Sequence, residues 1–252
     1  MIFAAGLGTR LRPLPDTMPK ALVTVAGKPM LERVVDNLIN AGFHDIIINI
    51  HHFGEQIIDF VNSRKFDANI IISDERNLLL DTGGGVKKAL PMLEGNEPVL
   101  LHNADILTDV DLKALYNSHL ESNADATLLV AKRNSSRCLF FSNGSLRGWM
   151  NKTNGATRPN GFSPAEEMEE LAFSGIHVIS PSIFREIEEY TAEPVFSIMP
   201  FYLSVCHKMN IRCCEQSAPY KWFDIGKPES LALANEELNP NRSLQRLGCE
   251  NK

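Results

Sequence analysis

The sequence predicts an α/β protein built on a doubly wound, mostly parallel sheet of the Rossmann-like type. In the first half of the chain, short β-branched runs alternate with segments whose apolar residues recur at helical spacing. The segments between the runs are long enough for the helical crossovers that parallel strands require. The run at 46–50, IIINI, is typical of a strand that helices cover on both faces.

The elements of the first half follow in order. The apolar start, residues 1–5, predicts that the chain begins inside the first strand. Gly42 ends the first helix, and Pro91 lies near the end of the third. We expect further strands at 46–50, 69–73, 99–102 and 126–131, and helices at 28–41, 55–61, 84–93 and 112–120.

The second half of the chain has a different character. Residues 138–170 are polar and rich in turns, and Asn143-Gly144 predicts a β-hairpin within a small β-rich insertion. We expect strands at 171–179 and 211–214, and helices at 182–190, 196–206 and 229–238. These patterns predict one domain over residues 1–238, in halves of about 1–132 and 133–238, followed by a polar tail at 239–252.

The composition excludes several classes of function. With 252 residues, of which 44% are hydrophobic, the chain can bury a full core. Its formal net charge of -6 argues against a nucleic-acid binder. It has no apolar run long enough for a membrane span and no start typical of a secretory signal. The five cysteines show no C-x-x-C or zinc spacing, and free thiols fit a reducing cytoplasm, so we expect a cytoplasmic protein.

The segment at 4–20, AAGLGTRLRPLPDTMPK, is the most informative part of the chain. Gly6 and Gly8 let the backbone come close to a ligand, and exposed backbone N–H groups there can bind an anion. Arg10, Arg12 and Lys20 add positive charge in the same segment. The loop therefore predicts a site for a polyphosphate.

Other interpretations of this loop fit less well. A dinucleotide-binding G-x-G-x-x-G pattern matches Gly6 and Gly8 but has Leu11 in the third position. A Walker A loop requires G-K-[ST], whereas the chain has Gly-Lys-Pro at 27–29, without the metal-binding hydroxyl. An ordinary turn with solvated charges is the remaining alternative, and the density of Gly, Arg and Pro disfavours it.

Two acidic residues and a second glycine cluster also follow predicted strands or turns. Asp105 comes just after the strand at 99–102, where it is either a Mg²⁺ ligand or a turn residue. Asp224, in WFDIGKPE, is a turn residue if taken alone. The DTGGG segment at 81–85 precedes a predicted helix and is either a flexible loop or a backbone surface for a nucleobase.

Three segments in the right order resemble motifs of the sugar-1-phosphate nucleotidylyltransferases. The loop resembles their G-x-G-T-R-[LM]-x-P-L-T…P-K signature, the HNAD segment ending at Asp105 their G-D motif, and the segment around Asp224 their W-x-D-[IV]-G motif. Pro15 stands where the family usually has Thr. The resemblance implies the fold of nucleotide-diphospho-sugar transferases. The signature residues present are Gly6, Gly8, Thr9, Arg10, Leu11, Pro13, Leu14, Pro19 and Lys20.

The resemblance also implies roles for individual residues. Arg10 and Lys20 are the expected catalytic residues, and Asp105 and Asp224 the expected Mg²⁺ ligands. Those two carboxylates can share an ion only if the fold brings them together. The expected nucleotide-binding residues are Ala5, Gly6, Gly8, Thr9, Thr82, Gly83 and Asn103. The expected sugar-binding residues are Ser174 and Gly175, in an F-[AS]-G-I strand, and Lys152, since the chain lacks the family's E-K-P lysine motif.

The implied reaction joins a nucleoside triphosphate to a sugar 1-phosphate and releases pyrophosphate. The nucleotide would bind in the half at about 1–132 and the sugar in the half at about 133–238. The DTGGG segment resembles that of uridylyltransferases acting on N-acetylmuramate 1-phosphate, which favours UTP and a role in cell-wall sugar recycling. A mannose-1-phosphate guanylyltransferase and a catalytically inactive nucleotide-sugar sensor remain open.

Overall fold

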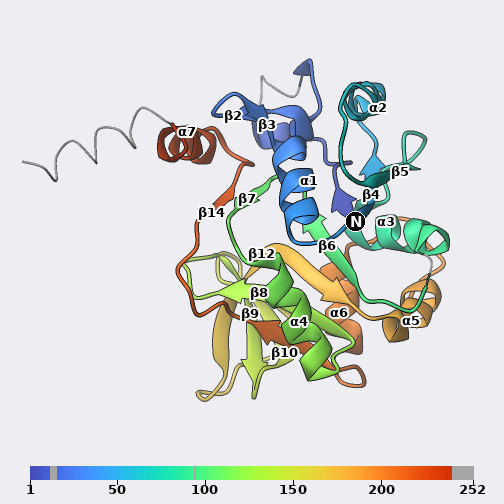
Figure 1. Cartoon of the computed structure of the whole chain (residues 1–252). Helices are drawn as coiled ribbons and strands as arrows, with labels where there is room; N and C mark the ends of the chain where they lie inside the picture. The colour runs from blue at the N-terminus through green and yellow to red at the C-terminus, as the bar shows by residue number, and fades with distance from the viewer. Residues whose placement is uncertain (12–15, 94, 240–252) are drawn as a thin grey trace, which may run out of the picture.

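A mixed β-sheet with helices on both faces forms the body of the molecule (Figure 1). The computed structural model describes residues 1–11, 16–93 and 95–239. Within these ranges the main sheet has ten strands in the order β11-β10-β13-β8-β12-β6-β1-β4-β5, and β9 pairs with β10 and β12. The strands are β1 (Ile2–Phe3), β4 (Asp45–Ile50), β5 (Asn69–Asp74), β6 (Val99–Asn103), β8 (Ala126–Ala131), β9 (Arg137–Ser142), β10 (Ser145–Asn151), β11 (Ala156–Arg158), β12 (Glu169–Ile179) and β13 (Ile211–Cys214).

The strands of the main sheet other than β10 and β12 point in one direction. β1 pairs in parallel with β4 and β6, β4 with β5, and β8 with β13. β12 enters between β6 and β8 and is antiparallel to both, so β6 and β8 point the same way. The predicted α/β fold with a doubly wound sheet is therefore confirmed, and the antiparallel pairings of β10 and β12 make the sheet mixed.

Helices cover both faces of the sheet, as a doubly wound fold requires. Residues of α1, α2 and α4 pack in one buried cluster, and residues of α3, α5 and α6 in another. On β4, Ile46 and Ile48 belong to the first cluster and Ile47 to the second, because successive side chains of a strand point to opposite faces. The helices are α1 (Met30–Asn40), α2 (Gly54–Asn62), α3 (Asp81–Ala89), α4 (Leu112–Ser122), α5 (Phe184–Glu189), α6 (Ile198–Val205) and α7 (Pro228–Glu237).

Two small ladders lie outside the main sheet, and the sequence patterns did not predict them. One consists of β2 (Thr24–Val25) and β3 (Lys28–Pro29). The other pairs β7 (Ile106–Thr108) with β14 (Trp222–Asp224) in antiparallel fashion. This second ladder joins the segment after β6 to the segment before α7.

The turn chemistry of the β-rich part agrees with the sequence. Asn143 and Gly144 both adopt left-handed backbone conformations, with φ of 50° and 73°, and connect β9 to β10. Two consecutive residues with positive φ are typical of a type I′ hairpin turn, which Asn-Gly favours. The hairpin expected at these two residues is thus confirmed.

The second glycine cluster is helical rather than a loop. α3 begins at Asp81, so the glycines that follow form its first turns. A Cβ on Gly83 would lie 2.3 Å from the Phe196 ring, and one on Gly84 would lie 2.2 Å from the Pro194 carbonyl oxygen. Glycine therefore allows α3 to pack against the chain just before α6.

Some expectations fall on residues that the structure does not describe. Arg12, Pro13, Leu14 and Pro15 of the expected phosphate-binding loop lie outside the described ranges, as does the expected polar tail except for Asn239. Within the described ranges, no helix combines the length and the apolar character needed to cross a membrane.

Candidate active site

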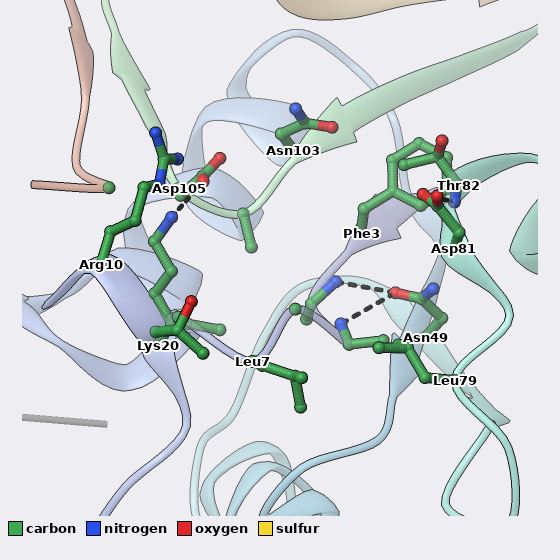
Figure 2. Close-up of a pocket in the computed structure, with 18 of the residues that line it drawn as sticks. Phe3, Leu7, Arg10, Lys20, Asn49, Leu79, Asp81, Thr82, Asn103 and Asp105 are labelled. Atoms are coloured by element: carbon green, nitrogen blue, oxygen red, sulfur yellow. Dashed lines mark hydrogen bonds and ion pairs between the residues drawn. The ribbon is translucent and has the colours of Figure 1, made fainter. Parts of the chain in front are cut away.

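Two adjoining cavities open where the parallel strands β1 and β6 end. The first encloses about 530 Å³ and is lined by the loop after β1, by Lys20 and by the residues after β6 (Figure 2). The second encloses about 820 Å³ and extends toward β12 and β14. The residues that line both cavities are Arg10, Asp81, Thr82, Asn103 and Asp105.

The register of the sheet brings the two main loops together. Phe3, the last residue of β1, lies opposite Asn103, the last residue of β6. The backbone N–H of Ala104 donates to the Phe3 carbonyl over 3.0 Å. Because both strands end at the same edge, the glycine loop and Asp105 leave the sheet side by side. This edge is where open α/β sheets bind their ligands.

A buried asparagine holds the start of the glycine loop. The Asn49 side-chain oxygen accepts hydrogen bonds from the backbone N–H groups of Ala4 (2.7 Å) and Ala5 (3.3 Å), as Figure 2 shows. Its amide nitrogen donates to buried Glu75 over 2.8 Å. The N–H of Ala5 is thus used within the protein, although Ala5 still lines the first cavity. Sequence reasoning missed Asn49, whose signal was a polar residue inside an apolar strand.

The rest of the loop exposes its backbone to the cavity. Gly6, Gly8 and Thr9 all line the first cavity. Gly8 has a φ of +64°, which favours glycine, and its carbonyl accepts from the N–H of Leu11 over 2.9 Å. A Cβ on Gly6 would meet nothing within 4 Å, so the space beside it is open.

Both expected catalytic cations face carboxylates. The Lys20 ammonium donates to the Asp105 carboxylate, and its side chain is only 12% exposed. A guanidinium nitrogen of Arg10 lies 3.8 Å from a carboxylate oxygen of Asp224, and Arg10 is 58% exposed. The site therefore holds two cation–carboxylate pairs, one partly buried and one open to solvent.

The fold brings Asp105 and Asp224 together. In the β7–β14 ladder, Asp224 lies opposite Ile106, and the N–H of Ile225 donates to the Asp105 carbonyl over 2.8 Å. Asp105 and Asp224 can share an ion only if they are neighbours in space. The backbone contact between their two segments places them next to each other. One carboxylate oxygen of Asp224, Oδ1, is buried and has no hydrogen-bond partner among the described residues.

Gly226 makes room for the Arg10–Asp224 pair. A Cβ at this position would lie 2.6 Å from the Arg10 guanidinium and 2.6 Å from the Asp224 carboxylate. The glycine after Asp224 in the WFDIG segment thus permits the close approach of these two side chains. Sequence analysis gave this glycine no role beyond its place in the W-x-D-[IV]-G motif.

The two residues of α3 that were expected to contact the nucleobase differ in their position relative to the cavities. Thr82 lines both cavities, and its hydroxyl accepts from the N–H of Ile198 over 3.0 Å. Gly83 lines neither cavity, and its N–H donates to the Phe196 carbonyl over 2.8 Å. Asp81, which sequence reasoning left without a role, lines both cavities at the start of the helix.

The expected sugar-binding residues are also divided. Gly175 lines the second cavity with a φ of +78°, and a Cβ there would lie 2.8 Å from Ile106. Ser174 is buried just behind this wall. Lys152 lines neither cavity, because its ammonium forms an ion pair with Glu170 elsewhere on the β-rich part. The cations on the second cavity are Arg10, Arg133, Arg137 and Lys227.

Arg133 is the most constrained of these cations. Its guanidinium lies 3.8 Å from the centre of the Trp222 ring and donates to the Ser174 hydroxyl (2.9 Å) and to the Phe173 carbonyl. Burial lowers the pKa of Arg133 from its ordinary value, while nearby Asp224 acts in the opposite direction. Arg133 therefore forms a rigid, cationic wall that no sequence motif indicated.

Comparison with known proteins gives a consistent result. Residues 1–241 match the family model described as Nucleotidyl transferase. The chain is 31% identical over 245 residues to an N-acetylmuramate alpha-1-phosphate uridylyltransferase of Caulobacter vibrioides, covering 94% of this chain and 96% of the relative. It is 36% identical over 233 residues to the enzyme of that name from Neisseria meningitidis serogroup B, covering 90% and 92%.

The fold has close counterparts among solved structures. UDP-glucose pyrophosphorylase from Acinetobacter baumannii superposes with a TM-score of 0.74 at 19% identity, covering 100% of this chain and 98% of that one. Three motifs, a matching family model and relatives above 30% identity over most of both chains agree. The chain belongs to the nucleotidyl transferase family and is an enzyme of the sugar-1-phosphate nucleotidyltransferase type.

Proposed function

We propose that this enzyme transfers a uridylyl group from UTP to N-acetylmuramate 1-phosphate and releases pyrophosphate. The observation that carries the proposal is the meeting of two cavities at Arg10 and Asp105, with Lys20 and Asp224 beside them. One cavity has the phosphate-binding loop, and the other has the cations suited to an acidic sugar. The sequence relatives favour the same pair of substrates. A place in cell-wall sugar recycling, in the cytoplasm, follows from that choice.

The step we propose is an in-line displacement. An oxygen of the sugar phosphate attacks the α-phosphorus of UTP, a new P–O bond forms, and the bond to the pyrophosphate leaving group breaks. The attacking oxygen is already an anion near neutral pH, so no general base is needed. The main barrier is repulsion between two polyanions, which cationic side chains reduce.

Each site residue has a role in reducing that repulsion. Arg10, on the open side, would bind the triphosphate and the charge that develops on the leaving group. Lys20, which is held against Asp105, would lie near the α-phosphate and the incoming phosphate. The N–H groups of Gly6 and Gly8 would donate to phosphate oxygens. Thr82 and Asn103, which line both cavities, would contact the nucleoside.

The residues present fit Mg²⁺. Asp105 and Asp224 are held next to each other, and the buried Oδ1 of Asp224 has no protein partner among the described residues. These residues contain no cluster of three or more His, Cys, Asp or Glu side chains suited to a metal. Two carboxylates are what Mg²⁺ commonly takes from a protein when phosphates and water complete its shell. When bound, the ion would neutralise phosphate charge and orient the leaving group.

The charge of the second cavity favours N-acetylmuramate 1-phosphate as the acceptor. N-acetylmuramate carries a carboxylate that glucose, mannose and N-acetylglucosamine lack. The second cavity has Arg137, which is exposed and whose guanidinium has no hydrogen-bond or ion-pair partner among the described residues, and Lys227. Either cation could pair with that carboxylate, whereas a sugar without a carboxylate would leave the cation without this partner.

A pyrophosphate-release assay tests the proposal. UTP, GTP, CTP and dTTP are each combined with N-acetylmuramate, N-acetylglucosamine, glucose and mannose 1-phosphates in the presence of Mg²⁺. We expect the highest kcat/KM for UTP with N-acetylmuramate 1-phosphate. The highest value for GTP with mannose 1-phosphate would support the guanylyltransferase alternative. No release from any pair, with nucleotide-sugar binding intact, would support an inactive sensor.

A further inference from the structure

A third cavity lies behind the β-rich part of the sheet, formed by β10, β11 and α6. It encloses about 760 Å³, a size between those of the two cavities of the active site. Trp149 also borders the second cavity, whereas the other lining residues belong to the third cavity alone. The lining residues used below are Arg147, Trp149, Thr157, Arg158, Asn160, Tyr190 and His207.

The charge on this cavity has one sign. Arg147 and Arg158 line it, together with His207. Among the described residues that line it, none is Asp or Glu. In the described part of the chain, neither arginine forms an ion pair or a side-chain hydrogen bond. In a protein with a net charge of -6, these arginines form a local concentration of basic side chains.

The two arginines come from neighbouring strands and line the same cavity. Arg158 of β11 lies opposite Trp149 of β10, and Arg147 precedes Trp149 by two residues. The pairing of β10 with β9 shifts register between Leu146 and Gly148, so Arg147 lies at a β-bulge, and it lines the same cavity as Arg158. Two long guanidinium side chains that line one cavity can both donate to the same phosphate.

The rest of the lining suits the remainder of a phosphorylated ligand. Trp149 and Tyr190 supply aromatic surfaces, which pack against the faces of sugar rings or bases. Thr157 and Asn160 supply polar groups beside the arginines. A largely apolar lining with a small number of convergent polar groups is typical of a small-molecule site.

We propose that this cavity is a second binding site for a small phosphate monoester, with the phosphate between Arg147 and Arg158 and its ring against Trp149. The site is separate from the one in which nucleotide and sugar react, and it does not depend on which substrates that site takes. An occupant would contact Trp149, a side chain that also borders the second cavity.

Tryptophan fluorescence provides the test. The chain has two tryptophans, Trp149 and Trp222, so a Trp222→Phe protein reports Trp149 alone. Glucose 6-phosphate is the probe, because it has no phosphate at C1 and is not an acceptor for the proposed reaction. Uridine 5′-monophosphate is titrated in parallel to distinguish a sugar phosphate from a nucleotide, and glucose serves as the uncharged control. We expect a saturable change with at least one phosphate and none with glucose.

Variants identify the cavity that binds the probe. Arg147→Gln and Arg158→Gln should each raise the apparent Kd about tenfold or more, because each removes a charge-assisted hydrogen bond. Arg64→Gln, at an exposed arginine near α2, is the matched control and should leave it unchanged. Circular dichroism verifies that each variant is folded.

Two results would overturn the proposal. One is the absence of a saturable change with either phosphate. The other is binding that persists in Arg147→Gln and Arg158→Gln but disappears in Arg10→Gln, which would assign the signal to the active site. Binding that survives Arg10→Gln and is lost with the two cavity arginines supports it.

Discussion

Asp105 and Asp224 are far apart in the sequence and adjacent in space, because the N–H of Ile225 donates to the Asp105 carbonyl over 2.8 Å. Each carboxylate also faces one of the expected catalytic cations, Lys20 for Asp105 and Arg10 for Asp224. The β7–β14 ladder therefore joins the segment that follows β6, at the first cavity, to the segment that borders the second. The following predictions test what depends on this arrangement.

Arg10→Ala should abolish turnover without unfolding the protein. Loss of a preorganised cationic donor typically lowers kcat by about 10²–10³. Arg10 is 58% exposed and its pair with Asp224 is open to solvent, so the unfolding free energy should change by less than about 1 kcal/mol. Pyrophosphate release gives kcat, and thermal unfolding gives stability. Arg64→Ala is the control for removal of an exposed arginine, and a fully active Arg10→Ala enzyme would refute the role of Arg10.

Gly226→Ala should reduce activity more than stability. The added Cβ would lie 2.6 Å from the Arg10 guanidinium and from the Asp224 carboxylate, which are both the mobile ends of side chains. These groups can move aside at little cost to folding, but their displacement disturbs the site. We expect kcat to fall at least about tenfold, as for the loss of one positioned group, with little change in Tm. An unchanged kcat, or a large loss of Tm, would contradict this account.

Asn49→Leu should weaken both the fold and nucleotide binding. The substitution leaves the N–H groups of Ala4 and Ala5, and buried Glu75, without their shared partner. Unsatisfied buried groups cost about 1–3 kcal/mol, measurable by urea unfolding. The KM for the nucleotide should also rise, because the glycine loop starts at these residues. Asn69→Leu, at an exposed asparagine of β5, is the control and should change stability by less than about 0.5 kcal/mol.

Arg137→Gln should raise the KM for N-acetylmuramate 1-phosphate about tenfold, but not the KM for N-acetylglucosamine 1-phosphate, which has no carboxylate to pair. Lys152→Gln should change neither value, because Lys152 pairs with Glu170 outside both cavities. Steady-state kinetics with both acceptors distinguish the two cations. A larger effect of Lys152→Gln would instead assign the sugar phosphate to Lys152.

Acidification should destabilise the protein through His119. This side chain is buried between Thr127 (2.9 Å) and Ser180 (2.8 Å), and burial lowers its pKa to about 4. Between the ordinary pKa near 6.5 and about 4, the unfolded chain binds this proton and the native protein does not. Stability is therefore full above about pH 6.5 and falls as the pH is lowered, by about 1.4 kcal/mol per pH unit for this group.

Urea unfolding between pH 7 and pH 5 checks this expectation. His119→Gln should reduce the slope of unfolding free energy against pH, even if it lowers stability at every pH. His44→Gln is the control, at a histidine on the protein surface. An identical slope in His119→Gln and the unsubstituted protein would show that His119 does not carry the effect.

Local features of the fold could be predicted because local residues encode them. The isoleucine run at 46–50 predicted a strand covered on both faces, and alternate residues of β4 do pack in two opposite clusters. Asn143-Gly144 predicted the hairpin turn. The glycine loop after β1 and Asp105 after β6 were expected at one sheet edge, since the carboxyl ends of parallel strands meet there.

Other features follow from packing between distant segments. The DTGGG segment was expected just before a helix, but it forms the first turns of α3. Its glycines leave room for the Phe196 ring and the Pro194 carbonyl, which lie close to this helix. Lys152 follows the hairpin as expected, yet its ammonium pairs with Glu170 of another strand. No sequence motif indicated Arg133, and its guanidinium is held by the Trp222 ring and by the Ser174 hydroxyl of β12.

The sequence by itself determined the fold class, the glycine loop after the first strand and the family, since each depends on residues that are close together in the chain. Only the tertiary structure decided which cations border the second cavity and how Asp105 meets Asp224. The strands that join them, β7 and β14, have three residues each, too few for a recognisable periodicity. Their pairing becomes favourable only after the main sheet has brought their two segments together.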